Sequence, residues 1–126
     1  MRSYLLSAAA LALSVLSAGP VLAAGPSFSC ARATRADERA ICRSSALRTA
    51  DARMAALYRD IQHCTAMGGH GTNLDDQQAW LARRAECGGN SACISRLYRG
   101  RIAEFAPMAA KARRFMLKGE CPNVLE

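Results

Sequence analysis

Cys87 and Cys93 stand six positions apart around a Gly-Gly-Asn-Ser turn, and they are the clearest candidates for chemistry in this chain. Two nearby thiols can hold a metal, exchange electrons or form a structural disulfide. A redox pair normally has two intervening residues, whereas this pair has five. Zinc requires four converging ligands, and the nearest candidates, His63, Cys64 and His70, lie across a second glycine-rich stretch. A structural disulfide is therefore the favoured interpretation if the chain reaches an oxidising compartment.

The first residues predict export to such a compartment. Residues 1–23 combine one early positive charge, an apolar run over residues 4–17 and small residues before the end, which is typical of a signal peptide cut after Ala23 or Ala24. The apolar run is shorter than the roughly 20 residues of a membrane span, so an uncleaved anchor is the less favoured alternative. The first cysteine, Cys30, does not stand where a lipid would be attached. We expect a periplasmic or secreted protein that is not a lipoprotein.

Export leaves a short, basic, cysteine-rich chain. Removal of residues 1–23 takes one of the 17 Lys+Arg residues and no acid, so the formal net charge falls from +7 to +6 over 103 residues. All six cysteines remain, and an even number in a short exported chain predicts a disulfide framework whose pairing the count leaves open. The charge favours anionic partners such as envelope polymers, lipid headgroups or acidic proteins, with a solvated basic surface as the simpler alternative. Export argues against nucleic acid as a partner.

Apolar residues recur at helical spacing and no stretch alternates as a strand would, which predicts an all-α fold. We expect one domain over residues 24–126, a small disulfide-stapled helical bundle with a hairpin core of about three to four helices. An extended lead-in over residues 24–33 precedes a short helix, for which Thr34 and Asp37 resemble a capping box. The strongest helical pattern covers about residues 45–64.

The glycines that follow predict a break. Residues 65–73 carry three glycines within four positions, which predicts a loop of about eight residues. Asn73 is suited to cap the next helix, which would run as far as Cys87, and Asp75 and Asp76 would lie in its first turn.

The remaining chain contains three further helix boundaries. Asn90 or Ser91 is suited to begin a third long helix. Pro107 predicts the start of a separate final helix, which Gly119 ends. This helix belongs to a basic C-terminal extension over residues 107–126.

Asp51 shares a helix stripe with Leu47, Met54 and Tyr58, so its carboxylate is expected on the side that faces the core. A buried charge requires a partner. Arg84 is the natural candidate because its planar guanidinium can grip a carboxylate with two hydrogen bonds. We expect a structural Asp51–Arg84 ion pair, with a polar ligand site as the alternative.

Several short motifs occur in an order and spacing similar to one exported bacterial family. They are FSC at 28–30, ERAIC at 38–42, L...D..M...Y at 47–58, Q..WL..R..C at 77–87 and C....Y..RI at 93–102. On these motifs, most of the chain after the signal peptide resembles the lysozyme inhibitor LprI-like domain family. The family-motif positions here are Leu47, Met54, Tyr58, Gln77, Trp80, Tyr98 and Arg101. We expect Tyr58 and Trp80 in the core, and Tyr98 and Arg101 partly exposed.

The resemblance also implies a disulfide pairing. The family pairs its cysteines locally, which implies two bonds here, Cys30–Cys42 and Cys87–Cys93. A third bond between Cys64 and Cys121 would follow, with free thiols or an intermolecular bridge as the alternatives. This chain departs from the family by having Cys64 and Cys121, a basic helix beyond Phe105 and no lipidation signal.

The motifs do not indicate an enzyme. The sequence lacks a nucleophile elbow, an HExxH metal motif and a phosphate-binding loop. We therefore expect a protein without catalytic activity, metal or cofactor.

The resemblance implies a binding protein that inhibits lysozyme or binds another envelope protein. Many lysozymes are basic, so a partner of charge +6 needs a locally acidic face. The candidate acids for that face are Asp75, Asp76, Glu86 and Glu104.

The alternative function is binding or support of the envelope surface through the last predicted helix. Its basic residues are Lys111, Arg113, Arg114 and Lys118, and they alternate with Met108, Phe115, Met116 and Leu117. Such a helix could lie on anionic membrane or polysaccharide, or it could pack on the core with a solvated basic side.

Overall fold

A computed structural model describes residues 25–65 and 67–121, and most of these residues are helical. A 3-10 turn, η1 (Cys30–Arg32), precedes four α-helices: α1 (Ala36–Arg43), α2 (Ser45–His63), α3 (Met67–Glu86) and α4 (Ser91–Lys118). No strand occurs in the described ranges, which confirms the predicted all-α class. The expected signal peptide and the last five residues of the C-terminal extension lie outside the described residues.

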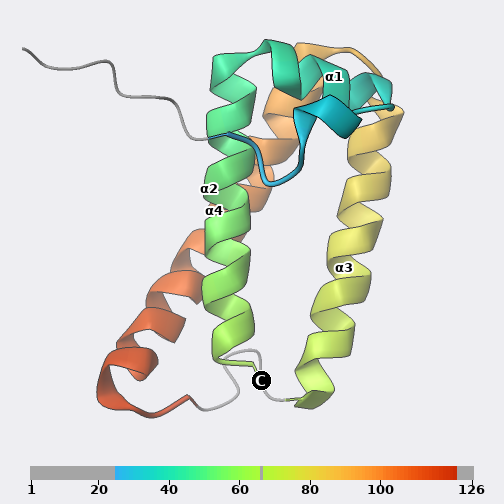
Figure 1. Ribbon diagram of the computed structural model, residues 1–126. Helices are drawn as coiled ribbons and strands as arrows, with labels where there is room; N and C mark the ends of the chain where they lie inside the picture. The colour runs from blue at the N-terminus through green and yellow to red at the C-terminus, as the bar shows by residue number, and fades with distance from the viewer. Residues whose placement is uncertain (1–24, 66, 122–126) are drawn as a thin grey trace, which may run out of the picture.

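The three long helices form the body of the fold, and α1 closes one end of it. Figure 1 shows α2 and α3 side by side with α1 between their upper ends, while α4 crosses behind α2. α2 packs along α4, and α1 contacts all three long helices. The last turns of α4 emerge on the side of α2 that lies away from α3 (Figure 1).

α2 follows the sequence prediction closely because its signals are local. The Ser44 side chain accepts a hydrogen bond from the backbone N–H of Leu47 at 3.3 Å, which caps the helix. Its inward stripe is buried in a core that includes residues of α4 and Trp80 of α3. The buried apolar residues of the stripe are Leu47, Met54, Leu57 and Ile61.

The predicted loop over residues 65–73 is wrong, because α3 already begins at Met67. Asn73 therefore does not cap the helix; its side-chain Nδ2 donates to Gln62 Oε1 at 3.1 Å and to Thr65 Oγ1 at 3.3 Å. These bonds tie the first turns of α3 to the end of α2. Tertiary contacts thus outweigh the low helix propensity of glycine, about 1 kcal/mol per residue.

The predicted break at Pro107 is also wrong, because α4 continues through it. Proline lacks the N–H that would bond the carbonyl of Ala103, and both residues are exposed, so water can satisfy that carbonyl. Phe105 and Ala109 are buried on either side of the proline and hold the two halves of α4 on the core. The helix ends as expected at Gly119, whose φ of 69° suits a glycine.

Three disulfides join the ends of these elements, and they confirm the predicted framework. Cys30 is bonded to Cys42, Cys64 to Cys121 and Cys87 to Cys93. The first ties η1 to α1, and the second links the end of α2 to the segment after α4. The third joins the end of α3 to the start of α4, where Asn90 caps α4 by accepting from the N–H of Cys93 at 3.0 Å.

Candidate functional site

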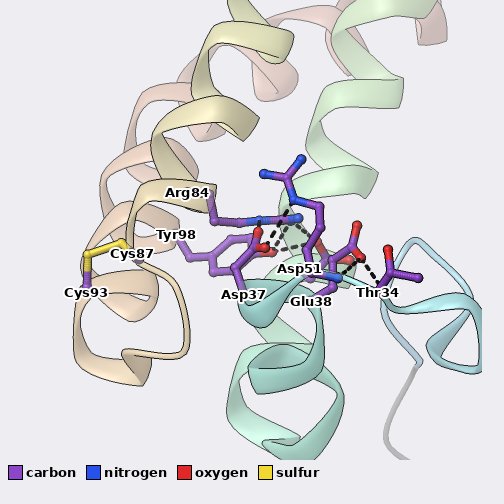
Figure 2. Close-up of polar contacts among 9 residues, drawn as sticks. Thr34, Asp37, Glu38, Asp51, Arg84, Cys87, Cys93 and Tyr98 are labelled. Atoms are coloured by element: carbon purple, nitrogen blue, oxygen red, sulfur yellow. Dashed lines mark hydrogen bonds and ion pairs between the residues drawn. A yellow bond between two sulfur atoms is a disulfide. The ribbon is translucent and has the colours of Figure 1, made fainter.

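A buried polar network connects α1, α2, α3 and α4 at the end of the bundle closed by α1. Arg84 Nε donates to Asp37 Oδ2 at 2.9 Å, and Arg84 Nη1 donates to the Tyr98 hydroxyl at 3.0 Å. The Tyr98 hydroxyl in turn donates to Asp51 Oδ1 at 2.7 Å. Figure 2 shows these side chains converging on the guanidinium. Arg84 Nη1 lies 3.7 Å from Asp51 Oδ1, so Asp51 is in the network but is not the closest partner of Arg84.

The predicted capping box is wrong, and the correction explains why Asp37 is available. The Glu38 carboxylate, not that of Asp37, accepts from the backbone N–H groups of Thr34 and Arg35, both at 3.2 Å. Arg35 is the N-cap of α1. Asp37 points inward instead, where it is 1% exposed and bonds to Arg84.

The network shifts the pKa values of three of its members, Asp37, Arg84 and Tyr98, and the pKa of Arg84 is raised. Burial alone would raise the pKa of Asp37, but the hydrogen bond and charge of Arg84, with the charge of Arg35, hold that pKa below its usual value. Burial and the charge of Asp51 raise the pKa of Tyr98 well above its usual value. At neutral pH the network therefore contains ionised Asp37 and a neutral tyrosine.

The network is enclosed and internally satisfied, which suits a structural role rather than a ligand site. Asp51 is fully buried, and its Oδ2 accepts from the backbone N–H of Ser27. The guanidinium of Arg84 lies 5.8 Å from the ring centre of Phe28 and 5.9 Å from that of Trp80. The lead-in segment is thereby attached to the helices through both its backbone and its aromatic side chain.

The other family-motif positions lie in or next to the core. Leu47, Met54 and Trp80 are buried, while Tyr58 and Gln77 are half-buried. The expectation that Tyr98 and Arg101 are partly exposed is wrong: they are 1% and 6% exposed. Tyr98 is buried because its hydroxyl finds partners in the network.

An open pocket of about 320 Å³ lies between α2, α3 and α4. The residues that α2 and α3 contribute come from the second half of α2 and the first half of α3, so the pocket lies farther from α1 than the polar network does. It falls at the lower end of the volumes typical of ligand sites. Six polar or charged side chains and four apolar or aromatic ones line it. The lining residues are Tyr58, Ile61, Thr65, Gly69, Thr72, Asn73, Asp76, Arg101, Glu104, Phe105 and Met108.

Arg101 forms part of the pocket wall and is already engaged. Its Nη1 donates to Glu104 Oε2 at 3.0 Å, its Nη2 donates to Gln77 Oε1 at 3.2 Å, and its Cζ lies 4.2 Å from the ring centre of Phe105. Its Nε is covered by the protein and is the one buried side-chain nitrogen or oxygen in residues 25–65 and 67–121 without a hydrogen-bond partner. This guanidinium is therefore fixed in place by its neighbours.

The pocket brings together two of the predicted acids from different helices. Asp76 of α3 and Glu104 of α4 both line it, although 28 positions separate them in sequence. The Glu104 side chain is 56% exposed and forms an ion pair with Arg101. Asp76 is exposed and has no ion pair among the described side chains. Two carboxylates against one guanidinium leave the pocket with a formal charge of −1.

The structure does not bring the other candidate binding residues to this pocket. Asp75 is exposed beside Asp76 but does not line the cavity, and Glu86 is exposed at the far end of α3. Arg113 pairs with Asp60 of α2 at 2.6 Å. The remaining basic candidates are exposed on the last turns of α4, and they are Lys111, Arg114 and Lys118.

The apolar residues between those basic residues are mostly used inside the fold. Met108 lines the pocket, and Phe115 and Met116 pack against buried Cys64 and Ala112. Leu117, at 88% exposed, is the one large apolar side chain left fully exposed on the described part of α4. The end of α4 therefore lacks a continuous exposed apolar stripe.

Sequence reasoning missed the pocket because it depends on the course of α3. Thr72, Asn73 and Asp76 reach the cavity only because the glycine-rich segment is helical and packs against α2. The one signal in the sequence for a polar site here is that Thr72, Asn73 and Asp76 follow directly after the glycines.

No protein-family model, curated protein or solved structure matches this chain. Within residues 25–65 and 67–121, no group of three or more His, Cys, Asp or Glu side chains is arranged to hold a metal ion. None of the helices there is both long enough and apolar enough to cross a membrane.

Proposed function

We propose that the protein is an exported, non-enzymatic binding domain that uses the pocket between α2, α3 and α4 to bind a protein partner. The resemblance to the LprI-like family implies a lysozyme as that partner. The three disulfides support export to the periplasm or beyond, because such bonds form and persist in oxidising compartments.

One observation carries this proposal: the chain is basic overall, but two carboxylates, those of Asp76 and Glu104, line its pocket. The formal charge after removal of the signal peptide is +6, which opposes association with a basic protein at long range. Asp76 and Glu104 provide a local surface of opposite sign, with apolar walls that a partner can fill. The disulfides and the Arg84 network hold the helices that present it.

The test is lysozyme activity on bacterial cell walls with and without the purified, oxidised protein. At micromolar concentration the protein should slow lysis in proportion to its concentration. Asp76→Arg should weaken this protection more than Asp75→Arg, because the two changes add the same charge but only the first adds it to the pocket. Unchanged lysis at micromolar protein would rule out the inhibitor function.

A second candidate function is binding to an anionic envelope surface through the end of α4. Leu117 is 88% exposed next to Lys118, which is the observation that favours it. The test is sedimentation with anionic vesicles at low and high salt, since electrostatic binding weakens as salt screens it. Sedimentation that does not depend on Lys111, Arg114 and Lys118 would rule out this surface.

A further inference from the structure

We infer that the pocket between α2, α3 and α4 receives a basic side chain, an arginine or a lysine, from the protein partner. This inference rests on the proposed function and names the group that enters the site. The cavity, its apolar walls, its two carboxylates and the state of its own arginine carry it together.

The charge of the pocket selects against an anion. Arg101 is the one cation among its lining residues, and Glu104 and Gln77 already occupy two of its nitrogens while Phe105 covers one of its faces. Its third nitrogen, Nε, is covered by the protein. An incoming anion would have to displace Glu104 and remain close to Asp76.

The same groups suit an incoming cation. Asp76 is exposed and unpaired among the described residues, and Glu104 is more than half exposed with one carboxylate oxygen bonded to Arg101. A guanidinium or ammonium between these two residues would neutralise the formal charge of −1. Charge complementarity therefore identifies a basic group as the occupant.

The walls suit the methylene stem that carries such a charge. Ile61, Phe105 and Met108 form an apolar side of the cavity. Tyr58 lies against Phe105 with ring centres 5.9 Å apart, and it also borders the cavity. Long basic side chains bury their methylene groups on apolar surface while their charged end contacts polar groups. In this pocket the apolar side would contact the methylene groups, and Asp76 and Glu104 would contact the charge.

The direct test uses three matched small probes with the full oxidised protein: the Nα-acetyl N-methylamides of arginine, citrulline and glutamate. Citrulline has nearly the shape of arginine without its charge. In NMR titrations the arginine probe should shift the Met108 methyl and the Asn73 side-chain amide, with a Kd on the order of 1 mM. The Leu117 methyl, which lies outside the pocket, should not move. Equal shifts from citrulline, or tighter binding of glutamate, would overturn the inference.

Matched variants test which carboxylates bind the arginine probe. Asp76→Asn and Glu104→Gln should each weaken the arginine probe about twofold to fivefold, the range for exposed ion pairs. Asp75→Asn is the control, because it removes the same charge outside the cavity. Equal weakening by Asp75→Asn would show a general charge effect and would overturn the inference. Circular dichroism checks that all three variants are folded.

The same variants separate this inference from the proposed function. Binding of the arginine probe without protection from lysozyme supports the pocket chemistry and rules out lysozyme as the partner. Protection that is equal for the wild type and for the Asp76→Asn, Glu104→Gln double variant supports inhibition but overturns the pocket as the site that receives a basic side chain.

Discussion

Arg84 and Asp37 form the closest ion pair of the buried network, with Nε and Oδ2 2.9 Å apart across 47 positions of sequence. Both side chains are almost fully buried. Asp51 lies farther from the guanidinium, at 3.7 Å, and receives a hydrogen bond from Tyr98 instead. Arg84 therefore interacts with two carboxylates. It bonds to Asp37 directly and to Asp51 through the Tyr98 hydroxyl. This division leads to different expectations for the two aspartates.

Replacement of Asp37 should destabilise the protein more than replacement of Asp51. Asp37→Asn removes the charge that directly balances buried Arg84, and loss of one partner of a buried pair costs about 3 kcal/mol. Asp51→Asn weakens hydrogen bonds to a charged group, which costs about 1–3 kcal/mol. Urea unfolding of the two variants measures the difference in the free energy of unfolding.

Asp60→Asn is the control for loss of a carboxylate charge. Asp60 pairs with Arg113, whose side chain is 55% exposed, so its replacement should cost less than about 1 kcal/mol. A larger loss from Asp51→Asn than from Asp37→Asn would show that Asp51 is the main counter-charge of Arg84, as the sequence alone suggested.

The Asp37 contribution should disappear in acid. The pKa of Asp37 is lower in the folded protein than its ordinary value of 3.8, so the folded state binds the proton less readily than the unfolded state. Its contribution is therefore present above about pH 4 and is lost as the pH falls through the lowered folded pKa. In urea unfolding from pH 6 to pH 2, the stability gap between wild type and Asp37→Asn should narrow below about pH 4. A gap that stays constant to pH 2 would contradict this linkage.

The parts of the fold that were predictable from sequence depend on local chemistry. Ser44, Asn90 and Gly119 mark helix ends because a cap acts on backbone groups within a few residues. The expectation of export predicted a disulfide framework, and the resemblance supplied the pairing of Cys30–Cys42 and Cys87–Cys93. These features need no knowledge of how distant segments meet.

The parts that were not predictable depend on distant contacts. Asp37 looked like a capping residue because its inward partner, Arg84, belongs to α3. The glycines before Asn73 looked like a loop because the side chains that bond to Asn73 precede them in the chain, Gln62 at the end of α2 and Thr65 just after it. The pocket was missed for the same reason, although Asp76 and Glu104 had been identified as acids of interest.

The three disulfides should differ in their contribution to stability because they close loops of different length. Cys64–Cys121 spans 57 positions and Cys87–Cys93 spans 6, so loop entropy assigns them about 4 and about 2 kcal/mol. Replacing both members of each pair by alanine and measuring urea unfolding tests the order. Buried Cys64 adds a packing loss, which increases the expected difference. Equal losses for the two pairs would contradict the loop-length argument.

Two glycines of α3 provide a matched test of its first turns. A Cβ on Gly69 would lie 2.6 Å from Thr65 Cγ2, whereas a Cβ on Gly71 would have no neighbour within 4 Å. Thr65 cannot easily turn away, since its hydroxyl donates to the Ile61 carbonyl at 2.8 Å and accepts from Asn73. Gly69→Ala should therefore lower the free energy of unfolding despite the better helix propensity of alanine.

Gly71→Ala should instead raise the free energy of unfolding by about 0.5–1 kcal/mol, because it reduces the freedom of the unfolded chain and favours the helix. Opposite signs for the two replacements require both a helix over these residues and the close contact of Gly69 with Thr65, the residue that follows the C-cap of α2. Urea unfolding gives the signs, and far-ultraviolet circular dichroism should show no loss of helix for Gly71→Ala. Two replacements of equal effect would indicate that the segment does not pack against Thr65, and the pocket beside it would then lose its α3 wall.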